Sequence, residues 1–295
     1  MKRQNEYGTA VVDRPYITRL KDWLHPLLLT QAKSKIRYNV EVLNDRNTIS
    51  GKPIIFVGNH STSSDFPIVT KVTGRRSYVL VGKQRLPLAD RVFFHLNGVI
   101  WVDRKSKSEM TGSKSILLEY LSRGQSIAWF PEGTWNLTPN LLMLPMKWGI
   151  IEVARQADAQ IIPLALDYDR GKNLCRVKYG APLAGSDLAD DRNGIRKLRD
   201  VMATLRWEMM EDRPTLSRAE TDPEKLKKEV EAAIDEYPAL NWEYECSCIY
   251  EPPDCISPDE AFEHLQHLIP CKGNAFLFRE RSCTLSENQE GSPCM

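Results

Sequence analysis

Short apolar runs with the composition of β-strands alternate along this chain with stretches that have helical periodicity. The strand-like runs are rich in Val, Ile and aromatic residues and cover residues 38–43, 53–57, 77–81, 98–102, 126–130, 160–166 and 174–179. Helical patterns lie between them at residues 66–72, 88–95, 107–122 and 147–156. This alternation predicts an α/β fold in which helices flank a central sheet of about seven strands, mostly parallel or mixed.

The chain has three regions that differ in composition. Residues 38–212 hold the alternating strands and helices and are predicted to form a single domain, preceded by an amphipathic segment at residues 1–37. Residues 213–295 form an acidic extension, because from residue 216 onward 17 Asp and Glu stand against seven Lys and Arg. A hydrophilic stretch at residues 222–236 predicts one exposed helix in this extension. No chemistry can be assigned to the extension from its sequence.

The extension also contains a capping box and most of the cysteines. Ser257 and Glu260 have the spacing that opens a helix. Six cysteine and histidine residues lie between positions 246 and 271: Cys246, Cys248, Cys255, His264, His267 and Cys271. They lack the paired C-x2-C spacing of zinc sites, so we expect neither a metal nor a cofactor. The odd total of seven scattered cysteines favours a reducing compartment over a disulfide framework.

Residues 15–35 have the pattern of an amphipathic helix, which Pro26 is expected to kink. The apolar positions recur every three or four residues: Ile17, Leu20, Trp23, Leu24, Leu27 and Leu28. This stripe, flanked by basic residues, suits either the interface of a membrane or the surface of the domain core. No apolar segment follows Lys2 and Arg3, so no signal peptide is predicted. No run approaches the ~18–20 apolar residues that span a bilayer.

A histidine and an aspartate follow the strand-like run at residues 53–57, at positions His60 and Asp65. An imidazole titrates near neutrality, and a neighbouring carboxylate fixes its tautomer and stabilises the imidazolium that forms on proton transfer. The chain contains no G-x-S-x-G motif for a serine nucleophile. The hydroxyl that this pair activates is therefore predicted to belong to a substrate. Asp65 also suits the start of a helix, and the two roles are compatible.

Three further blocks follow in order. They read G-V-I-W-V-D-R at Gly98–Arg104, F-P-E-G-T at Phe130–Thr134 and I-I-P-L at residues 161–164. With N-H-x4-D at Asn59–Asp65, they resemble the glycerolipid acyltransferase family, typified by bacterial lysophosphatidate (1-acyl-glycerol-3-phosphate) acyltransferases. The resemblance covers roughly residues 38–180. Four blocks in the right order are far more specific than a single H-x4-D.

The resemblance implies an acyl transfer in which His60 is the general base and Asp65 orients it. The donor would be a fatty-acyl thioester of acyl carrier protein or coenzyme A, and no acyl-enzyme would form. Glu132 would bind acceptor hydroxyls, and the backbone N–H groups of Gly133 and Thr134 are candidate oxyanion donors. The plainer interpretation of Glu132 and Gly133 is a tight turn after a strand.

The resemblance also assigns Arg104 and Lys83 to the phosphate of the acceptor, since a guanidinium fork suits a phosphate well. Surface salt bridges are the competing interpretation for both. The third family block ends in arginine, whereas this chain has Trp135. An indole does not replace a phosphate-binding cation, but it stacks on a sugar or an ammonium group, or lines an acyl channel. Trp135 is therefore a candidate for the acceptor pocket.

Three functions stay open on this basis. The first is transfer to a lysophospholipid, with Arg104, Lys83 and Lys147 binding the phosphate. The second is transfer to an amine or a non-phosphate hydroxyl of an aminolipid or glycolipid, as Trp135 suggests. The third is a non-catalytic lipid-binding protein, which the His–Asp pair disfavours because binding alone needs no general base.

Charge is distributed unevenly along the predicted domain. Between residues 71 and 107, nine Lys and Arg stand against two Asp. This basic block favours an anionic substrate, an acidic carrier protein or an anionic lipid surface. The expected partners are the acyl donor, the lysolipid acceptor and a membrane surface, and no nucleic acid. The expected location is peripheral, on the cytoplasmic face of the cell membrane.

Overall fold

The structure is a computed structural model that describes residues 15–44, 51–83, 88–137, 141–188, 191–212 and 222–235. All of these belong to the compact unit Met1–Tyr250. The predicted helix start at residues 257–260 and the cysteines and histidines from Cys246 to Cys271 lie outside the described residues. None of the described helices is long and apolar enough to cross a membrane.

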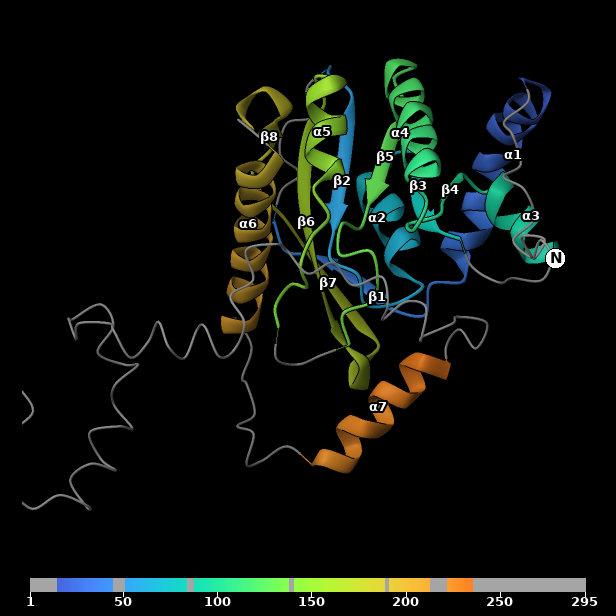
Figure 1. Cartoon of the computed structure of the whole chain (residues 1–295). Coiled ribbons are helices and arrows are strands. Elements are labelled where there is room, and N and C mark those ends of the chain that lie inside the picture. The colour runs from blue at the N-terminus through green and yellow to red at the C-terminus, as the bar shows by residue number, and fades with distance from the viewer. Residues whose placement is uncertain are drawn as a thin grey trace, which may run out of the picture. The chain divides into compact units, whose positions relative to one another are not determined.

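Eight strands form one mixed sheet (Figure 1) in the order β1-β7-β6-β2-β5-β3-β4, with β8 paired to β6. Their bounds are β1 Asn39–Val42, β2 Ile54–Gly58, β3 Ser77–Gly82, β4 Val99–Val102, β5 Ser126–Trp129, β6 Gln160–Asp169, β7 Leu174–Tyr179 and β8 Leu183–Ala184. The α/β fold with a sheet of about seven strands is therefore confirmed. The strand that sequence reasoning missed is the two-residue β8.

Strand direction decides where the loops gather. β2 is parallel to β5 and β6, and β3 is parallel to β4 and β5, whereas β7 and β8 run antiparallel to β6. The carboxyl ends of β2 to β6 therefore share one edge of the sheet, which is where α/β folds place their ligand sites. Every residue of β2 is buried, as expected for a central parallel strand with helices on both faces.

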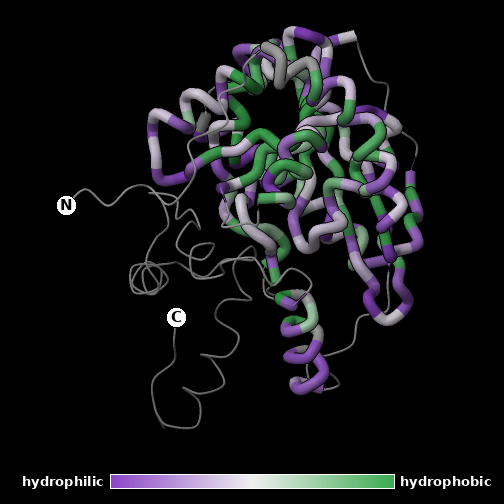
Figure 2. Tube along the Cα trace, turned by 90° about the vertical axis from the view of Figure 1, so that its right-hand side faces the viewer, coloured by the Kyte–Doolittle hydropathy of each residue, from purple (hydrophilic) through white to green (hydrophobic). Residues whose placement is uncertain are grey.

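Helices cover both faces of the sheet. Seven α-helices are described: α1 Pro15–Ser34, α2 Asp65–Thr73, α3 Leu88–Leu96, α4 Lys107–Ser122, α5 Gly149–Gln156, α6 Asp191–Glu211 and α7 Pro223–Asp235. Residues of α4, α5 and α6 share one hydrophobic core, and residues of α2 share the core of the opposite face. Figure 1 shows this layering, with α4 and α5 in front of the sheet and α2 behind it. The predicted helix at residues 222–236 is α7, along which hydrophilic residues predominate (Figure 2).

Helix α6 was not among the predicted elements, although its sequence contains a helical signal. Leu198, Met202, Leu205 and Met209 are buried at spacings of three and four residues. Arginines lie between these positions, so the mean hydropathy of the helix is hydrophilic and does not reveal the apolar stripe. The periodicity, rather than the average hydropathy, is the property that would have found this helix.

Helix α1 buries polar as well as apolar side chains, because Leu29 is buried together with Lys21 and His25. It contacts α2 and α3 and continues through Pro26. Lys21 and His25 are fully buried, whereas the exposed fractions of Trp23 and Leu27 are 68% and 63%. The Nζ atom of Lys21 donates to the carbonyl of Val99 at 3.1 Å, and Nε2 of His25 lies 3.1 Å from the carbonyl of Ser77. Polar side chains therefore attach α1 to the first residues of β3 and β4, and part of its apolar stripe faces outward.

Candidate active site

Three of the four sequence blocks end at the carboxyl edge of the sheet, where Lys83 also lies, and the fourth block, at residues 161–164, lies within β6. His60 follows β2, Lys83 follows β3, Arg104 follows β4 and Glu132 follows β5. Their strands are neighbours in the sheet, in the order β2-β5-β3-β4. Residues separated by more than 70 positions in the sequence are thereby placed along a single edge.

Asn59 extends strand β2 with its side chain. Its Nδ2 donates to the carbonyl of Leu166 at 3.0 Å, and its Oδ1 accepts from the N–H of Leu166 at 2.7 Å. The fully buried amide thus takes the place of a backbone pair in the ladder with β6. This contact holds the chain at the point where it leaves the strand, and so it sets the position of His60.

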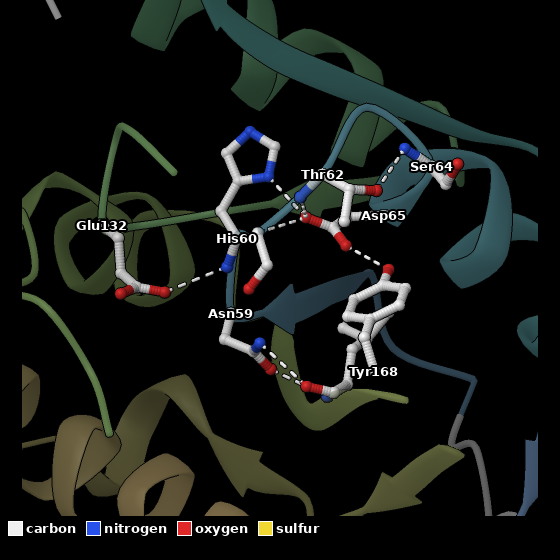
Figure 3. Close-up of polar contacts among 9 residues, drawn as sticks. Asn59, His60, Thr62, Ser64, Asp65, Glu132 and Tyr168 are labelled. Atoms are coloured by element: carbon white, nitrogen blue, oxygen red, sulfur yellow. Dashed lines mark hydrogen bonds and ion pairs between the residues drawn. The ribbon is translucent and has the colours of Figure 1, made fainter. Parts of the chain in front are cut away.

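His60 and Asp65 form a hydrogen-bonded pair (Figure 3). The Nδ1 atom of His60 lies 2.7 Å from Oδ2 of Asp65, which is the first residue of α2 and is fully buried. The same oxygen accepts from the backbone N–H groups of Ser61 at 2.6 Å and Thr62 at 2.9 Å. An ionised carboxylate only accepts, so Nδ1 carries the proton and Nε2 has a free lone pair. The imidazole is 24% exposed, and Figure 3 shows its second nitrogen pointing away from Asp65.

Tyr168 is a member of this cluster that sequence reasoning did not identify. It lies on β6, and its hydroxyl donates to Oδ1 of Asp65, the oxygen that does not face His60. The predicted strand ended at residue 166, two residues short of Tyr168. No local motif marks this tyrosine, because its contact depends on the pairing of β6 with β2 across the sheet.

Glu132 faces the interior of the protein. It is 1% exposed, with Oε1 accepting from the N–H of His60 at 3.0 Å and Oε2 accepting from the N–H of Leu144 at 2.7 Å. Burial raises the pKa of Glu132 to about 7, and the two backbone hydrogen bonds oppose that shift. Each carboxylate oxygen thus has one backbone donor, and the predicted contact with acceptor hydroxyls stays a prediction, but this geometry has a second meaning. It indicates that Glu132 holds the loop of His60 against the segment around Leu144.

The raised pKa of Glu132 predicts a pH-dependent stability. Ionising a carboxyl with a raised pKa costs free energy in the folded state, so stability falls as the pH rises from about 4.5 to about 7, by about 3 kcal/mol for this group. Glu132→Gln removes this titration. We measure the free energy of unfolding of both proteins in urea at several pH values. As the pH rises from about 4.5 to about 7, the free energy of unfolding of the wild type should fall relative to that of Glu132→Gln. A difference that is constant with pH would contradict this.

Aromatic side chains enclose the imidazole of His60. Its ring stacks on Phe130 with centroids 4.6 Å apart and meets Trp135 edge-on at 5.9 Å. The carbonyl of His60 accepts from the N–H of Asn136 at 2.6 Å. Trp135, which stands at the position of the family arginine, therefore lies directly beside the predicted base. This is where a residue of the acceptor pocket is expected.

The Pro-Glu-Gly turn also brings cations together. Gly133 has φ +75°, in the region that favours glycine, and its N–H donates to the carbonyl of Phe130 at 3.0 Å. Nη1 of Arg104 donates to the carbonyl of Gly133, and a β-carbon on Gly133 would lie 3.0 Å from Cε of Lys147. Arg104 and Lys147 thus converge on this turn. The neighbouring Thr134 is buried.

Lys83 is placed beside α4 rather than in an open position. Its Nζ lies 2.5 Å from Oε2 of Glu109, and its side chain is 14% exposed. The preceding residue, Gly82, lies against the guanidinium of Arg104, because a β-carbon there would be 2.7 Å from Nη2. Both predicted phosphate ligands therefore make protein contacts. In the part of the chain that is described, no three His, Cys, Asp or Glu side chains are grouped as metal ligands.

Comparison with known proteins shows which family this segment resembles. Residues 39–167 match the family model described as Acyltransferase, and this segment spans all four predicted blocks. Residues 39–167 are thus similar to the acyltransferase family, and the resemblance that the four blocks indicated is confirmed.

Individual relatives agree with this resemblance. The chain is 28% identical over 192 residues to the 1-acyl-sn-glycerol-3-phosphate acyltransferase of Saccharomyces cerevisiae, covering 58% of this chain and 60% of the yeast protein. It is 33% identical over 179 residues to 1-acyl-sn-glycerol-3-phosphate acyltransferase alpha of Mus musculus, covering 56% of this chain and 62% of the mouse protein. The matched part thus spans about 60% of the length of these two curated relatives.

A solved structure shares the fold. The crystal structure of the 1-acyl-sn-glycerophosphate (LPA) acyltransferase PlsC from Thermotoga maritima matches with a TM-score of 0.50 and 15% sequence identity. The match covers 68% of this chain and 83% of the Thermotoga chain. At this identity, the comparison supports the α/β architecture described above.

Proposed function

We propose that this protein is an O-acyltransferase that moves a fatty-acyl group from a thioester to the hydroxyl of a lysophospholipid, with 1-acyl-glycerol-3-phosphate as the acceptor and phosphatidate as the product. The observation that carries the proposal is the His60–Asp65 pair at the end of β2, inside the segment that matches the acyltransferase family. The names of the yeast and mouse relatives support the choice of acceptor.

The mechanism begins with Nε2 of His60 taking the proton of the acceptor hydroxyl. The oxygen attacks the thioester carbonyl, and a tetrahedral oxyanion forms. Asp65 stabilises the imidazolium through its hydrogen bond to Nδ1, as the aspartate does in a Ser-His-Asp triad. When the intermediate collapses, the C–S bond breaks and the thiolate takes the proton from His60. The products are the ester and the free thiol, and no acyl-enzyme is required.

The backbone N–H groups of Gly133 and Thr134 are the two candidate donors for the oxyanion. The N–H of Gly133 already donates to the carbonyl of Phe130 within the turn. We therefore favour the N–H of Thr134 as the oxyanion donor. Glu132 contributes indirectly, because its contact with the N–H of His60 holds the base in position.

The second candidate for the acceptor is a molecule that lacks a phosphate monoester, and Trp135 is the reason for considering it. Arg104 and Lys147 both approach Gly133, but the family arginine is absent at position 135. An indole beside the base suits a sugar or an ammonium group better than a phosphate. An amine or a non-phosphate hydroxyl on an aminolipid or glycolipid is the acceptor class that Trp135 favours.

A panel of acceptors separates the two candidates. Purified protein is given palmitoyl coenzyme A or palmitoyl acyl carrier protein, with lysophosphatidate, monoacylglycerol or a lyso-aminolipid as acceptor, and product formation is measured. Transfer to lysophosphatidate is the expected result. Transfer only to acceptors that lack a phosphate monoester would overturn the leading assignment in favour of the second.

Trp135→Arg sharpens this test. If the acceptor phosphate lies beside position 135, the new guanidinium should raise kcat/KM for lysophosphatidate about 10- to 100-fold, the range of one or two charge-assisted hydrogen bonds. The rate with monoacylglycerol should stay within a few-fold. Trp135→Phe is the matched control, because it removes the indole without adding charge. An equal change for both acceptors in Trp135→Arg would contradict this placement of the phosphate.

We further propose that the protein acts at a membrane surface and that α1 is the element that docks there. Trp23 and Leu27 point outward from α1, while Lys21 and His25 face the domain. Exposed apolar residues on a helix with cations at its end suit the headgroup region of a bilayer. Lys35 and Arg37, which are exposed just after α1, supply such cations.

A further inference from the structure

Asp65 receives hydrogen bonds on both of its oxygens. On Oδ2 it accepts from His60 and from the N–H groups of Ser61 and Thr62, and on Oδ1 it accepts from the hydroxyl of Tyr168. The first three donors come from the loop after β2, within five residues of Asp65. Tyr168 comes from a different strand, 103 positions away. It therefore ties the carboxylate of the dyad to the body of the sheet (Figure 3).

Tyr168 is itself held in place. Its ring meets that of Tyr38 edge-on, with centroids 4.8 Å apart. Burial raises the pKa of Tyr168 well above its ordinary value, and the neighbouring Asp65 carboxylate adds to this. The phenol therefore remains a donor throughout the pH range of an enzyme assay. A donor of this kind withdraws negative charge density from the Asp65 carboxylate. That charge would otherwise stabilise the imidazolium of His60.

We propose that Tyr168 is a positioning residue for the acyl transfer, whose hydroxyl holds Asp65 in the orientation that faces His60 and limits the basicity of that imidazole. This inference rests on the proposed role of His60 as general base. Tyr168 acts through Asp65 and touches no substrate. It is the third positioning residue of the site, because Asn59 and Glu132 fix the backbone around His60 while Tyr168 fixes its carboxylate partner.

Other groups that titrate or carry charge near the dyad bear on any test of pH dependence. Glu132, which contacts the N–H of His60, has a pKa of about 7. Cys175, which pairs with Tyr168 across β7 and β6, is buried, and burial raises its pKa. Asp167 is paired with Arg176 at 2.8 Å. All of these groups are common to the wild type and to Tyr168→Phe, so the comparison between the two isolates the hydroxyl.

Tyr168→Phe removes only the hydroxyl. We expect kcat to fall about tenfold, as for the loss of one hydrogen bond to a charged group, with KM within twofold of the wild type. We also expect the acidic limb of the kcat/KM profile to move to higher pH, because Asp65 then holds more charge against the imidazolium. In the free protein, the NMR signals of the His60 ring should titrate at a correspondingly higher pH.

Tyr78→Phe is the matched control, because the hydroxyl of Tyr78 makes the same kind of hydrogen bond to Asp22, away from the dyad. Its pH profile and its His60 ring titration should equal those of the wild type. An unchanged profile and an unchanged ring titration in Tyr168→Phe would overturn the proposal, however far kcat falls. So would an equal shift in both variants. If the wild type transfers no acyl group to any acceptor, the proposed function fails, and the ring titration still decides whether Tyr168 acts on His60.

Discussion

His60→Ala is expected to lower the rate of acyl transfer by about 10³-fold, within the range of 10²–10⁴ that general base catalysis contributes. Without the imidazole, no described side chain in hydrogen-bond contact with Asp65 can take the hydroxyl proton at neutral pH. The fold should survive, because the backbone N–H and carbonyl of residue 60 keep their contacts with Glu132 and Asn136. The release of coenzyme A thiol measures the rate, and the thermal unfolding midpoint checks the fold. A well-folded variant with the wild-type rate would remove His60 from the mechanism.

Asp65→Asn is the companion variant, and the hydrogen bonds of Asp65 suggest that the structure accepts it. An asparagine can place its oxygen toward the donors on the His60 side and its amide nitrogen toward the hydroxyl of Tyr168, which then accepts. The imidazole tautomer is kept and only the charge is lost. We therefore expect a rate loss of about 10²-fold, smaller than that of His60→Ala. A loss equal to that of His60→Ala would mean that the asparagine turns the other way and reverses the tautomer.

The positions of three of the four blocks, those that follow β2, β4 and β5, were predictable from the sequence because each depends on local rules. A strand-like run followed by a polar turn places His60, Arg104 and Glu132 at strand ends, and parallel pairing then brings those ends to one edge. The order of strands in the sheet was not needed for this result. The resemblance to a known family rested on the same local blocks, and the family match at residues 39–167 covers them.

The directions of individual side chains were not predictable in this way. Glu132 lies on a predicted turn, but whether it points to a substrate or to the N–H of Leu144 depends on the path of a segment 12 residues later. The contact of Tyr168 with Asp65 depends on strand register over 103 residues. These contacts are long-range, and no periodicity in a single sequence carries information about them.

Helix α1 is a case in which local rules left two interpretations open. Its apolar stripe offered two interpretations, and the simpler was that the stripe packs on the core. Strands β3 and β4 instead present the carbonyls of Ser77 and Val99 to this helix, and buried carbonyls need donors. Lys21 and His25 supply contacts of this kind. Part of the apolar stripe is thereby turned outward, which leaves Trp23 and Leu27 exposed.

Trp23→Asp combined with Leu27→Asp is expected to weaken binding to vesicles of anionic phospholipid by at least about 100-fold. Burying each of these side chains in an interface stabilises binding by about 1.5–3 kcal/mol, and a carboxylate at either position is repelled by an anionic surface. Co-sedimentation with the vesicles measures the affinity. The fold should be retained, because both side chains are mostly exposed and the contacts of α1 with the domain are made by other residues.

Trp207→Asp provides the matched control for this experiment. Trp207 is an exposed tryptophan, 53% accessible, on α6, which packs on β6 and β7 rather than against α2 and α3. If α1 is the docking element, Trp207→Asp binds vesicles as the wild type does. The α1 variant should also keep its rate with a short-chain acceptor dispersed in detergent while losing it with an acceptor embedded in vesicles, because its dyad is intact. Equal losses of vesicle affinity in the α1 and α6 variants would mean that apolar exposure in general, rather than the outward face of α1, brings the protein to the bilayer.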